Sequence, residues 1–232
     1  MAVIIKTPEK MVVRTKISYS IANAIRRSVD EIPAIAIDEV EIFKNDSALY
    51  DEVLAHRLGL VVLKTENKMG PKTEIDLKLK KKGPGMVYAE SLKGNAKIVY
   101  DKTPLTLLEN EQEIELVATA RFGTGLDHAK YAPGIIYYRN LLEVKSGNVK
   151  IDSIVENSKS EFKTEKKGNK WVCDLNESDV DKIKEIDDDA VKEIDEILIF
   201  AESFGHLDAE KIFAKSIEVL EENLQDFEKN LK

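Results

Sequence analysis

Residues 21–63 read IANAIRRSVDEIPAIAIDEVEIFKNDSALYDEVLAHRLGLVVL, and this stretch decides the fold. Its opening predicts a helix, because four apolar residues recur at helical spacing and share one face. These residues are Ile21, Ile25, Val29 and Ile32. Ser18 or Ser20 can cap the start of this helix, and Pro33 ends it. We therefore expect an amphipathic helix with one apolar face.

The rest of this stretch predicts a strand and a second, shorter helix. The strand covers Ala34–Lys44, and its apolar alternation slips by one residue between Ile37 and Val40. A β-bulge would produce such a slip, because it inserts one extra residue into one strand of a pair. The helix covers Leu49–Leu58 and closes at Gly59.

The C-terminal stretch, Glu202–Leu231, predicts a strand end and then a long helix for which Asp208 suits the N-cap. Its apolar residues are Phe213, Ile217, Leu220, Leu224, Phe227 and Leu231. Their spacings alternate four and three, which gives a seam of period 3.5. A helix that lies on its own domain usually has a wider apolar stripe. The narrow seam therefore favours packing against another helix, from this chain or from a partner.

The middle of the chain predicts a β-rich block. From Thr73 to Ile154 the apolar pattern is mostly of period two. The strands expected there are Ile75–Leu79, Ala96–Tyr100, Glu113–Ala120, Ile135–Val144 and Val149–Val155. A hairpin is expected over Ser160–Leu175 and a weak helix within Asn176–Lys192. A further strand is expected over Glu196–Glu202.

This order of elements predicts an α+β fold in which one small α/β domain has received an insertion. The discontinuous α/β domain would comprise residues 1–37 and 191–232. The inserted β-rich domain would span residues 38–155, with a separate segment at 156–190.

The composition describes a soluble globular protein. The chain has 232 residues, of which 43% are hydrophobic and 34% are charged, so it can bury a sizeable core. No apolar run approaches the roughly 20 residues of a membrane span, and no signal peptide is recognisable at the start. The single cysteine, Cys173, excludes a disulfide framework and a Cys-rich metal site within the chain. We expect a cytoplasmic protein.

The net charge of −8 is unevenly distributed. Residues 174–232 contain 19 acidic and 7 basic residues, which leaves the remainder of the chain slightly basic. An acidic chain is a poor candidate for direct binding of nucleic acid, which requires basic stripes. The basic cluster at Lys78–Lys82 ends an alternating strand and is typical of a solvated sheet edge.

Residues that could carry chemistry are few. Glu52 and His56 stand four apart on one helix, close enough for an intrahelical pair or two metal ligands, but no HExxH motif is present. The stretch Phe122–His128 is glycine-rich yet lacks both the P-loop and the dinucleotide pattern. Arg26 and Arg27 must point away from the apolar helix face, where guanidinium groups suit carboxylates of a partner. These features favour an assembly component over an enzyme.

These residues resemble those of the D-type, α-like subunits of archaeal RNA polymerase, a family related to the N-terminal domain of the bacterial α subunit. The resemblance is carried by a set of short segments in the same order. They are Asn23–Arg27, Glu31–Pro33, Ala36–Asp38, Leu49–Glu52, Ala55–Leu60, Ala120–Gly123, Asp127–Pro133 and Glu202–Gly205.

The resemblance implies a dimerisation domain that pairs with a smaller α-like subunit, called L. The residues expected at that interface are Ile21, Ile25, Val29, Phe213, Ile217, Leu220, Leu224, Phe227 and Leu231. It also implies that the inserted domain faces the second-largest polymerase subunit and the small subunit N. The residues expected there are Arg26, Arg27, Glu52, His56 and Arg57. Polymerisation and its magnesium would belong to the large subunits, so no active site is expected on this chain.

One departure from the family concerns an iron–sulfur cluster that some members hold in a ferredoxin-like insertion. The corresponding segment, residues 156–190, retains only Cys173, and one thiolate cannot hold a cluster. We expect a reduced remnant of that insertion and no bound cofactor.

Two alternative functions remain open from the sequence. The first is an enzyme that uses Glu52, His56 and His128, which requires these side chains to converge in one pocket. We expect them to be well separated. The second is a homodimeric α-like scaffold, in which the helical seam pairs with a second copy.

Overall fold

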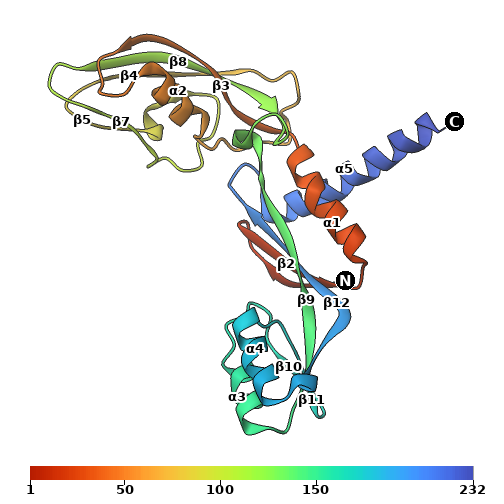
Figure 1. Ribbon diagram of the computed structural model, residues 1–232. Helices are drawn as coiled ribbons and strands as arrows, with labels where there is room; N and C mark the ends of the chain where they lie inside the picture. Colours follow the sequence, from red (N-terminus) through yellow and green to blue (C-terminus); the bar gives the residue numbers. More distant parts are fainter. Residues whose placement is uncertain (232) are drawn as a thin grey trace.

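The computed structural model describes residues 1–231 and has an α+β fold. At its centre lies a six-stranded antiparallel sheet with the order β1-β2-β12-β9-β11-β10. Its strands are β1 (Ala2–Lys6), β2 (Lys10–Thr15), β9 (Gly134–Lys145), β10 (Glu165–Lys167), β11 (Lys170–Cys173) and β12 (Val191–Ser203). The long strands β9 and β12 join the three parts of the molecule (Figure 1).

The first part is the insert, residues 34–123, which lies beyond one end of β9 (Figure 1). Its four-stranded sheet has the order β3-β8-β4-β6, and β5 pairs with β7 beside it. The bounds are β3 (Ala34–Asn45), β4 (Ile75–Lys82), β5 (Gly85–Tyr88), β6 (Lys93–Gly94), β7 (Pro104–Leu108) and β8 (Glu113–Gly123). The helix α2 (Asp51–Gly59) packs on this sheet through Leu54 and Leu58, which are fully buried.

Two features that the sequence predicts in this region are confirmed. The register of β3 against β8 shifts between Ile37 and Glu39, so the expected β-bulge lies at Asp38. The predicted short helix is α2, and it ends at Gly59.

The second part consists of the helices on the central sheet. The helix α1 (Tyr19–Ser28) is capped by Ser18, whose side chain accepts a hydrogen bond from the amide of Ile21 at 3.3 Å. A short 3-10 helix, η1 (Val29–Glu31), continues it, and α5 (Ala209–Asn230) crosses beside it. Their shared core lies against β2, β9 and β12. It includes Val13, Ile25, Val29, Ile136, Ile199, Ile212 and Phe213.

The third part is a small module, residues 146–190, at the other end of β9 and β12 (Figure 1). It contains α3 (Val149–Glu156), the β10–β11 hairpin and α4 (Glu177–Ile186). Asn148 and Asn176 cap the two helices, each through its side-chain oxygen. The predicted hairpin is confirmed, and Gly168 supplies the positive φ that its turn requires.

The prediction of a strand over Val149–Val155 is wrong, because this segment is α3. Its β-branched residues favour a strand by propensity. However, the Asn148 side chain accepts a hydrogen bond from the amide of Lys150, which starts a helix. Ile151 and Val155 then lie one turn apart and are both buried in the core of the module. Capping and tertiary burial together override the propensity.

Two other predicted strands differ from the structure, one in its extent and one in its sheet. The predicted strand Ala96–Tyr100 forms only an isolated bridge, between Ile98 and Leu63. The predicted strand Ile135–Val144 is present as β9, but it pairs with β12 and β11 in the central sheet and not within the insert. The boundary drawn at residue 155 is therefore wrong for β9, because pairing between distant strands leaves no trace in local periodicity.

Candidate functional site

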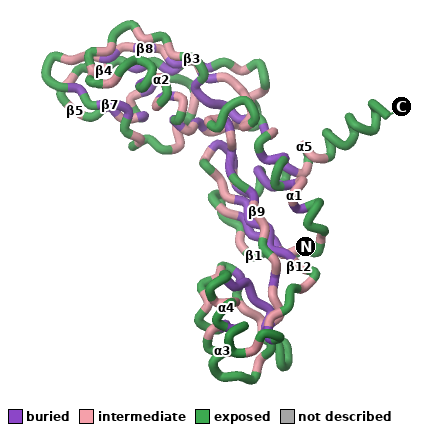
Figure 2. Tube along the Cα trace, in the orientation of Figure 1, coloured by how far each residue is buried: buried purple, intermediate pink, exposed green. Residues whose placement is uncertain are grey.

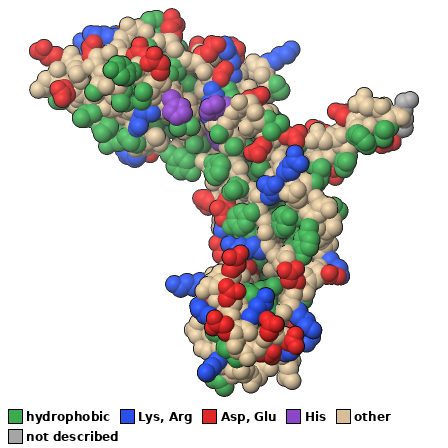
Figure 3. All heavy atoms as spheres, in the orientation of Figure 1, with side chains coloured by type: hydrophobic (Ala, Val, Ile, Leu, Met, Phe, Trp, Pro, Cys, Tyr) green, Lys and Arg blue, Asp and Glu red, His purple; other side chains and the backbone are tan. Residues whose placement is uncertain are grey.

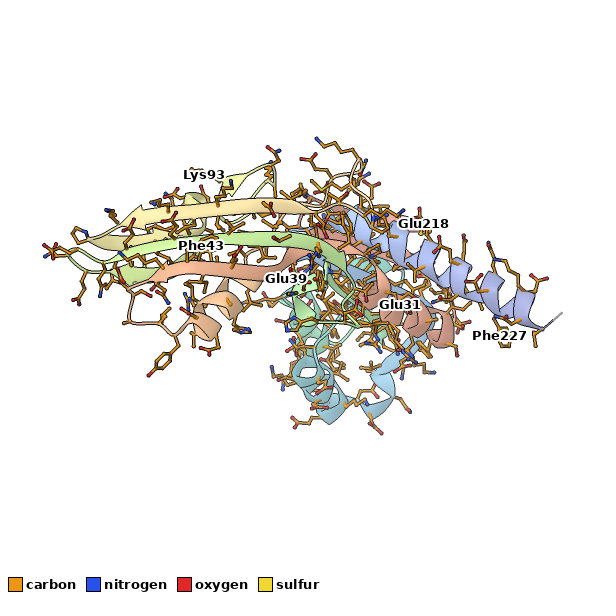
Figure 4. The ribbon with its side chains drawn as sticks, turned by 90° about the horizontal axis from the view of Figure 1, so that it is seen from above. Glu31, Glu39, Phe43, Lys93, Glu218 and Phe227 are labelled. Atoms are coloured by element: carbon orange, nitrogen blue, oxygen red, sulfur yellow. The ribbon has the colours of Figure 1, made fainter. Side chains whose placement is uncertain are left out.

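The C-terminal helix α5 is packed at its start and free at its end. Ile212 and Phe213 are buried in the core with α1, whereas every residue from 221 to 230 is exposed (Figure 2). The exposed part carries apolar side chains. Leu224 is 60% exposed, Phe227 63% and Leu231 71%. Beyond Asn223 this half of α5 stands clear of the rest of the chain (Figure 1), and Figure 4 shows Phe227 near its end.

The predicted seam is thus divided between the chain's own core and solvent. Ile25, Val29 and Phe213 are buried within this chain, so they are not available to a partner. Ile217 and Leu220 are half-buried, and Ile21 is 50% exposed. The 3.5-residue period cannot tell a seam residue that packs within the chain from one that packs on a partner, because both kinds of contact require the same spacing.

The exposed half of α5 receives little stabilisation from the rest of the chain. It extends the packed half of the same helix, but every residue from 221 to 230 is exposed, and tertiary packing supplies most helical stability in proteins. A contiguous exposed apolar surface on a soluble protein typically marks an interaction site. The distal part of α5, with Ile21 on α1, is therefore the first candidate interface.

The outer face of α1 carries the two adjacent arginines. Both Arg26 and Arg27 are exposed. Arg26 donates through Nε and Nη2 to Oδ1 of Asn23, both at 3.0 Å, which holds its guanidinium along the helix. Within residues 1–231, Arg27 has no ion pair. Asn223 of α5 donates to Glu31 of η1 at 2.9 Å, so α5 is also linked to the end of the segment that continues α1.

A second exposed apolar surface lies on the insert around α2. Tyr50 is 80% exposed, Val53 43% and Leu60 51%. Sequence analysis did not list these three residues among the expected partner-binding residues. Their signal was available as apolar residues next to Glu52 and His56 that fall outside the buried pair Leu54 and Leu58. We define the α2 surface as these three residues with Glu52 and His56, which are also exposed.

Arg57 differs from the other predicted partner-binding residues. It is half-buried, and its guanidinium donates to the carbonyl oxygens of Leu105, at 2.8 Å, and Pro104. These hydrogen bonds fasten α2 to β7. The structure therefore gives Arg57 a role in holding the α2 surface in place.

His56 and His128 line one shallow pocket of about 240 Å3, together with Asp38, Leu60 and Lys130. Figure 3 shows histidine side chains close together on one face of the molecule. The expectation that Glu52, His56 and His128 are well separated is therefore wrong for the two histidines, although Glu52 is not in the lining. The β8–β9 connection, which returns from the insert, brings His128 back beside α2.

The pocket offers an ion pair rather than catalytic machinery. Lys130 Nζ and the Tyr131 hydroxyl donate to Oδ1 of Asp38, at 2.8 and 2.9 Å. The Lys130 hydrogen bond lowers the pKa of the Asp38 carboxyl. The Nδ1 atom of His128 accepts a hydrogen bond from the amide of Lys130 at 3.0 Å. No serine, threonine or cysteine lines the pocket, and nowhere in residues 1–231 do three metal-ligating side chains gather.

The cysteine of the small module is also unsuited to a cofactor. Cys173 is fully buried among apolar residues that include Ile151, Trp171 and Ile183. Burial raises the pKa of its thiol to about 12, so the thiolate that a metal requires is disfavoured. The residues present do not fit an iron–sulfur cluster, and an apolar core fills the module.

Comparison with known proteins identifies the family. A family model described as the RNA polymerase Rpb3/RpoA insert domain matches residues 21–154. The chain belongs to this family. The match covers most of α1, the insert and β9, so it includes the α2 surface and Ile21 but no part of α5. Among residues 1–231, none of the helices is both long enough and apolar enough to span a membrane.

Curated relatives carry the name DNA-directed RNA polymerase subunit Rpo3. The one from Thermococcus kodakarensis is 40% identical over 134 residues, which are 53% of this chain and 52% of the relative. The one from Methanothermobacter thermautotrophicus is 38% identical over 148 residues. The chain thus spans about half the length of these relatives. The relative from Methanocaldococcus jannaschii is 26% identical over 226 residues, 97% of this chain and 91% of its own length.

Proposed function

We propose that this chain is the Rpo3-type subunit of an archaeal DNA-directed RNA polymerase, a non-catalytic platform on which other subunits assemble. The observation that carries the proposal is the free, apolar end of α5 in a member of the Rpb3/RpoA insert family. The relative from Methanocaldococcus jannaschii supports it, because that match runs along almost the whole chain. In this role nucleotidyl transfer and its magnesium belong to the large subunits.

The first partner in this proposal is the smaller α-like subunit L. Its helices would cover Ile21 and the distal residues Leu224, Phe227 and Leu231, with Ile217 and Leu220 at the edge of the contact. Ile25, Val29 and Phe213 would act from within, because they hold α1 and α5 in the crossing that presents this surface.

The second-largest subunit and the small subunit N would bind elsewhere. The α2 surface supports this assignment, because it exposes large apolar side chains together with Glu52 and His56. Arg26 and Arg27 on the outer face of α1 would pair with acidic groups of the same partners. Arg57 would contribute by keeping α2 on β7.

The domain assignment follows from these roles. Residues 1–37 and 191–232, with β9 added, would form a discontinuous dimerisation domain, and the insert would lie within residues 38–155. Residues 156–190, with α3, would be the reduced remnant of a ferredoxin-like insertion that holds no cluster. The chain would act in the cytoplasm, without contacting nucleic acid directly and without a membrane.

Co-expression with the small α-like subunit tests the proposal. A chain that ends at Leu220 keeps the packed half of α5 and loses only its exposed half. We expect the full chain to co-purify with the small subunit at 1:1, and the truncated chain to fold but not to co-purify. Glu222→Ala, on the helix face opposite the seam, is the matched control and should bind normally.

Two results would contradict the proposal. One is a full chain that remains a monodisperse monomer in the presence of the small subunit. The other is a stable homodimer of this chain that persists when the small subunit is added, which would favour the homodimeric scaffold. Mass measurement of the isolated and co-expressed chains distinguishes these outcomes.

A further inference from the structure

The segment Glu202–Gly205, which the sequence resemblance singles out, spans the end of β12 and the start of the connection to α5. Residues 203–208 lie against residues 62–65 of the insert. The amide of Thr65 donates to the carbonyl of His206, and Nδ1 of His206 lies 2.9 Å from the carbonyl oxygen of Leu63. His206 is only 3% exposed, so this polar contact is sealed from water.

An ion pair extends this contact to the first turn of α5. Asp208 has the backbone geometry of the N-cap, yet its side chain makes no cap hydrogen bond. Its carboxylate instead binds Lys64 Nζ at 2.6 Å. The hydrogen bond from Lys64 lowers the pKa of Asp208, so the carboxylate is charged in this position. The Asp208 side chain thus links the start of α5 to the insert and does not cap the helix.

The β8–β9 connection also holds the insert against the central sheet, through hydrogen bonds to residues outside the insert. The amide of Phe204 donates to the carbonyl of Pro133, and the amide of Leu126 donates to the carbonyl of Asp30. Tyr131 packs so closely on Gly123 that a Cβ atom at that glycine would lie 2.5 Å from the tyrosine ring. The same connection carries the contacts of Lys130 and Tyr131 with Asp38. The three family-like segments Ala120–Gly123, Asp127–Pro133 and Glu202–Gly205 therefore meet at the junction of insert and central sheet.

We propose that residues 62–65 and 203–208 form a clasp that fixes the insert relative to the central sheet. Parts of a chain that are joined only by short connections move relative to one another unless an interface holds them. The clasp sets the spacing between the α2 surface and α5. Because it includes the first turn of α5, a partner that stabilises α5 also stabilises the clasp and presents the α2 surface in one orientation. This coupling rests on the proposed function, in which both surfaces bind partners.

Distance measurement on the isolated chain tests the clasp without any partner. Lys93→Cys on the insert and Glu218→Cys on α5 place spin labels at two exposed positions, both labelled in Figure 4. Cys173 is fully buried and so does not take up label. We expect one narrow distance distribution in the parent chain. Lys64→Met and His206→Asn should each broaden it, whereas Lys64→Arg should keep it narrow.

Lys68→Met is the matched control, because Lys68 forms an exposed ion pair with Glu66 inside the same loop and does not reach α5. It should leave the distribution unchanged. Circular dichroism shows whether each variant is folded. If folded Lys64→Met and His206→Asn keep the narrow distribution, there is no clasp. That result leaves the proposed function intact, since co-purification with the small subunit is measured separately.

Hydrogen exchange at the Thr65 amide tests the coupling itself. This amide donates across the clasp, so its exchange reports clasp opening. We expect about tenfold slower exchange when the small α-like subunit is bound, a change of about 1.4 kcal/mol in opening free energy. Lys64→Met should remove this slowing while the small subunit still binds. Unchanged exchange at Thr65 in a formed heterodimer would overturn the coupling.

Discussion

Substitution of two phenylalanines on α5 by alanine should have opposite effects on folding stability and on partner binding. Phe213 is 6% exposed and lies in the core with α1, whereas Phe227 is 63% exposed on the distal half. Phe213→Ala should lower the local stability of the α1–α5 core by about 3–5 kcal/mol, because it removes buried contacts and leaves a cavity. Phe227→Ala should change that stability by no more than about 0.5 kcal/mol, as expected for an exposed position.

The effect on partner binding should be the reverse. Complete burial of a phenylalanine contributes about 1.5–3 kcal/mol, and roughly six-tenths of the Phe227 side chain is still available for burial. Covering it with a partner helix would therefore contribute about 1–2 kcal/mol. The Phe227→Ala variant should bind the small α-like subunit about 5–30-fold more weakly. Glu222→Ala, on the opposite helix face, should bind with unchanged affinity.

Two measurements on each variant check this contrast. Hydrogen exchange of the α1 amides reports local stability, and calorimetric titration with the purified small subunit reports affinity. If Phe227→Ala lowers protection of α1 as much as Phe213→Ala does, the distal half of α5 packs on this chain. If Phe227→Ala binds the small subunit with normal affinity, the exposed seam is not the interface.

Three further predictions concern His206, Arg57 and the cofactor. Burial lowers the pKa of His206 below its ordinary value of 6.5, so stability is full above about pH 6.5. Below about pH 6.5 the free energy of unfolding should fall by up to about 1.4 kcal/mol per pH unit, because the unfolded chain takes up the proton first. Thermal unfolding at acidic pH should show a weaker pH dependence for His206→Asn. The hydrogen bond from Lys64 lowers the pKa of Asp208, so that carboxylate does not add to the change in this window. Arg57→Met should destabilise α2 by about 1–3 kcal/mol, because it removes two hydrogen bonds to the carbonyls of Leu105 and Pro104. Faster amide hydrogen exchange in α2 would show this, and unchanged exchange would exclude the anchoring role of Arg57. Metal analysis of the purified chain should find no stoichiometric iron. One iron–sulfur cluster per chain would refute the proposal that residues 156–190 hold none.

The elements that the sequence predicts well are those set by neighbouring residues. Ser18 caps α1, Asp38 forms the bulge in β3, and Gly168 turns the β10–β11 hairpin, as the local pattern indicates. The prediction failed at α3, where Asn148 and tertiary burial outweighed the preference of β-branched residues for strands. The strand β9 was predicted correctly, but its assignment to the insert was wrong, because a strand gives no sign of which distant strand it pairs with.

The candidate site shows the same division. The sequence by itself determined that α1 and α5 are amphipathic, that the chain has a single cysteine, and that Arg26 and Arg27 lie on the outer face of α1. Only the tertiary structure decided that Phe213 is buried while Phe227 is free, and that His56 and His128 share a pocket. It also decided that Asp208 binds Lys64 instead of capping its own helix. The physical reason is range: periodicity and capping act within one turn or one strand, whereas burial and ion pairing depend on which distant segment the fold brings alongside.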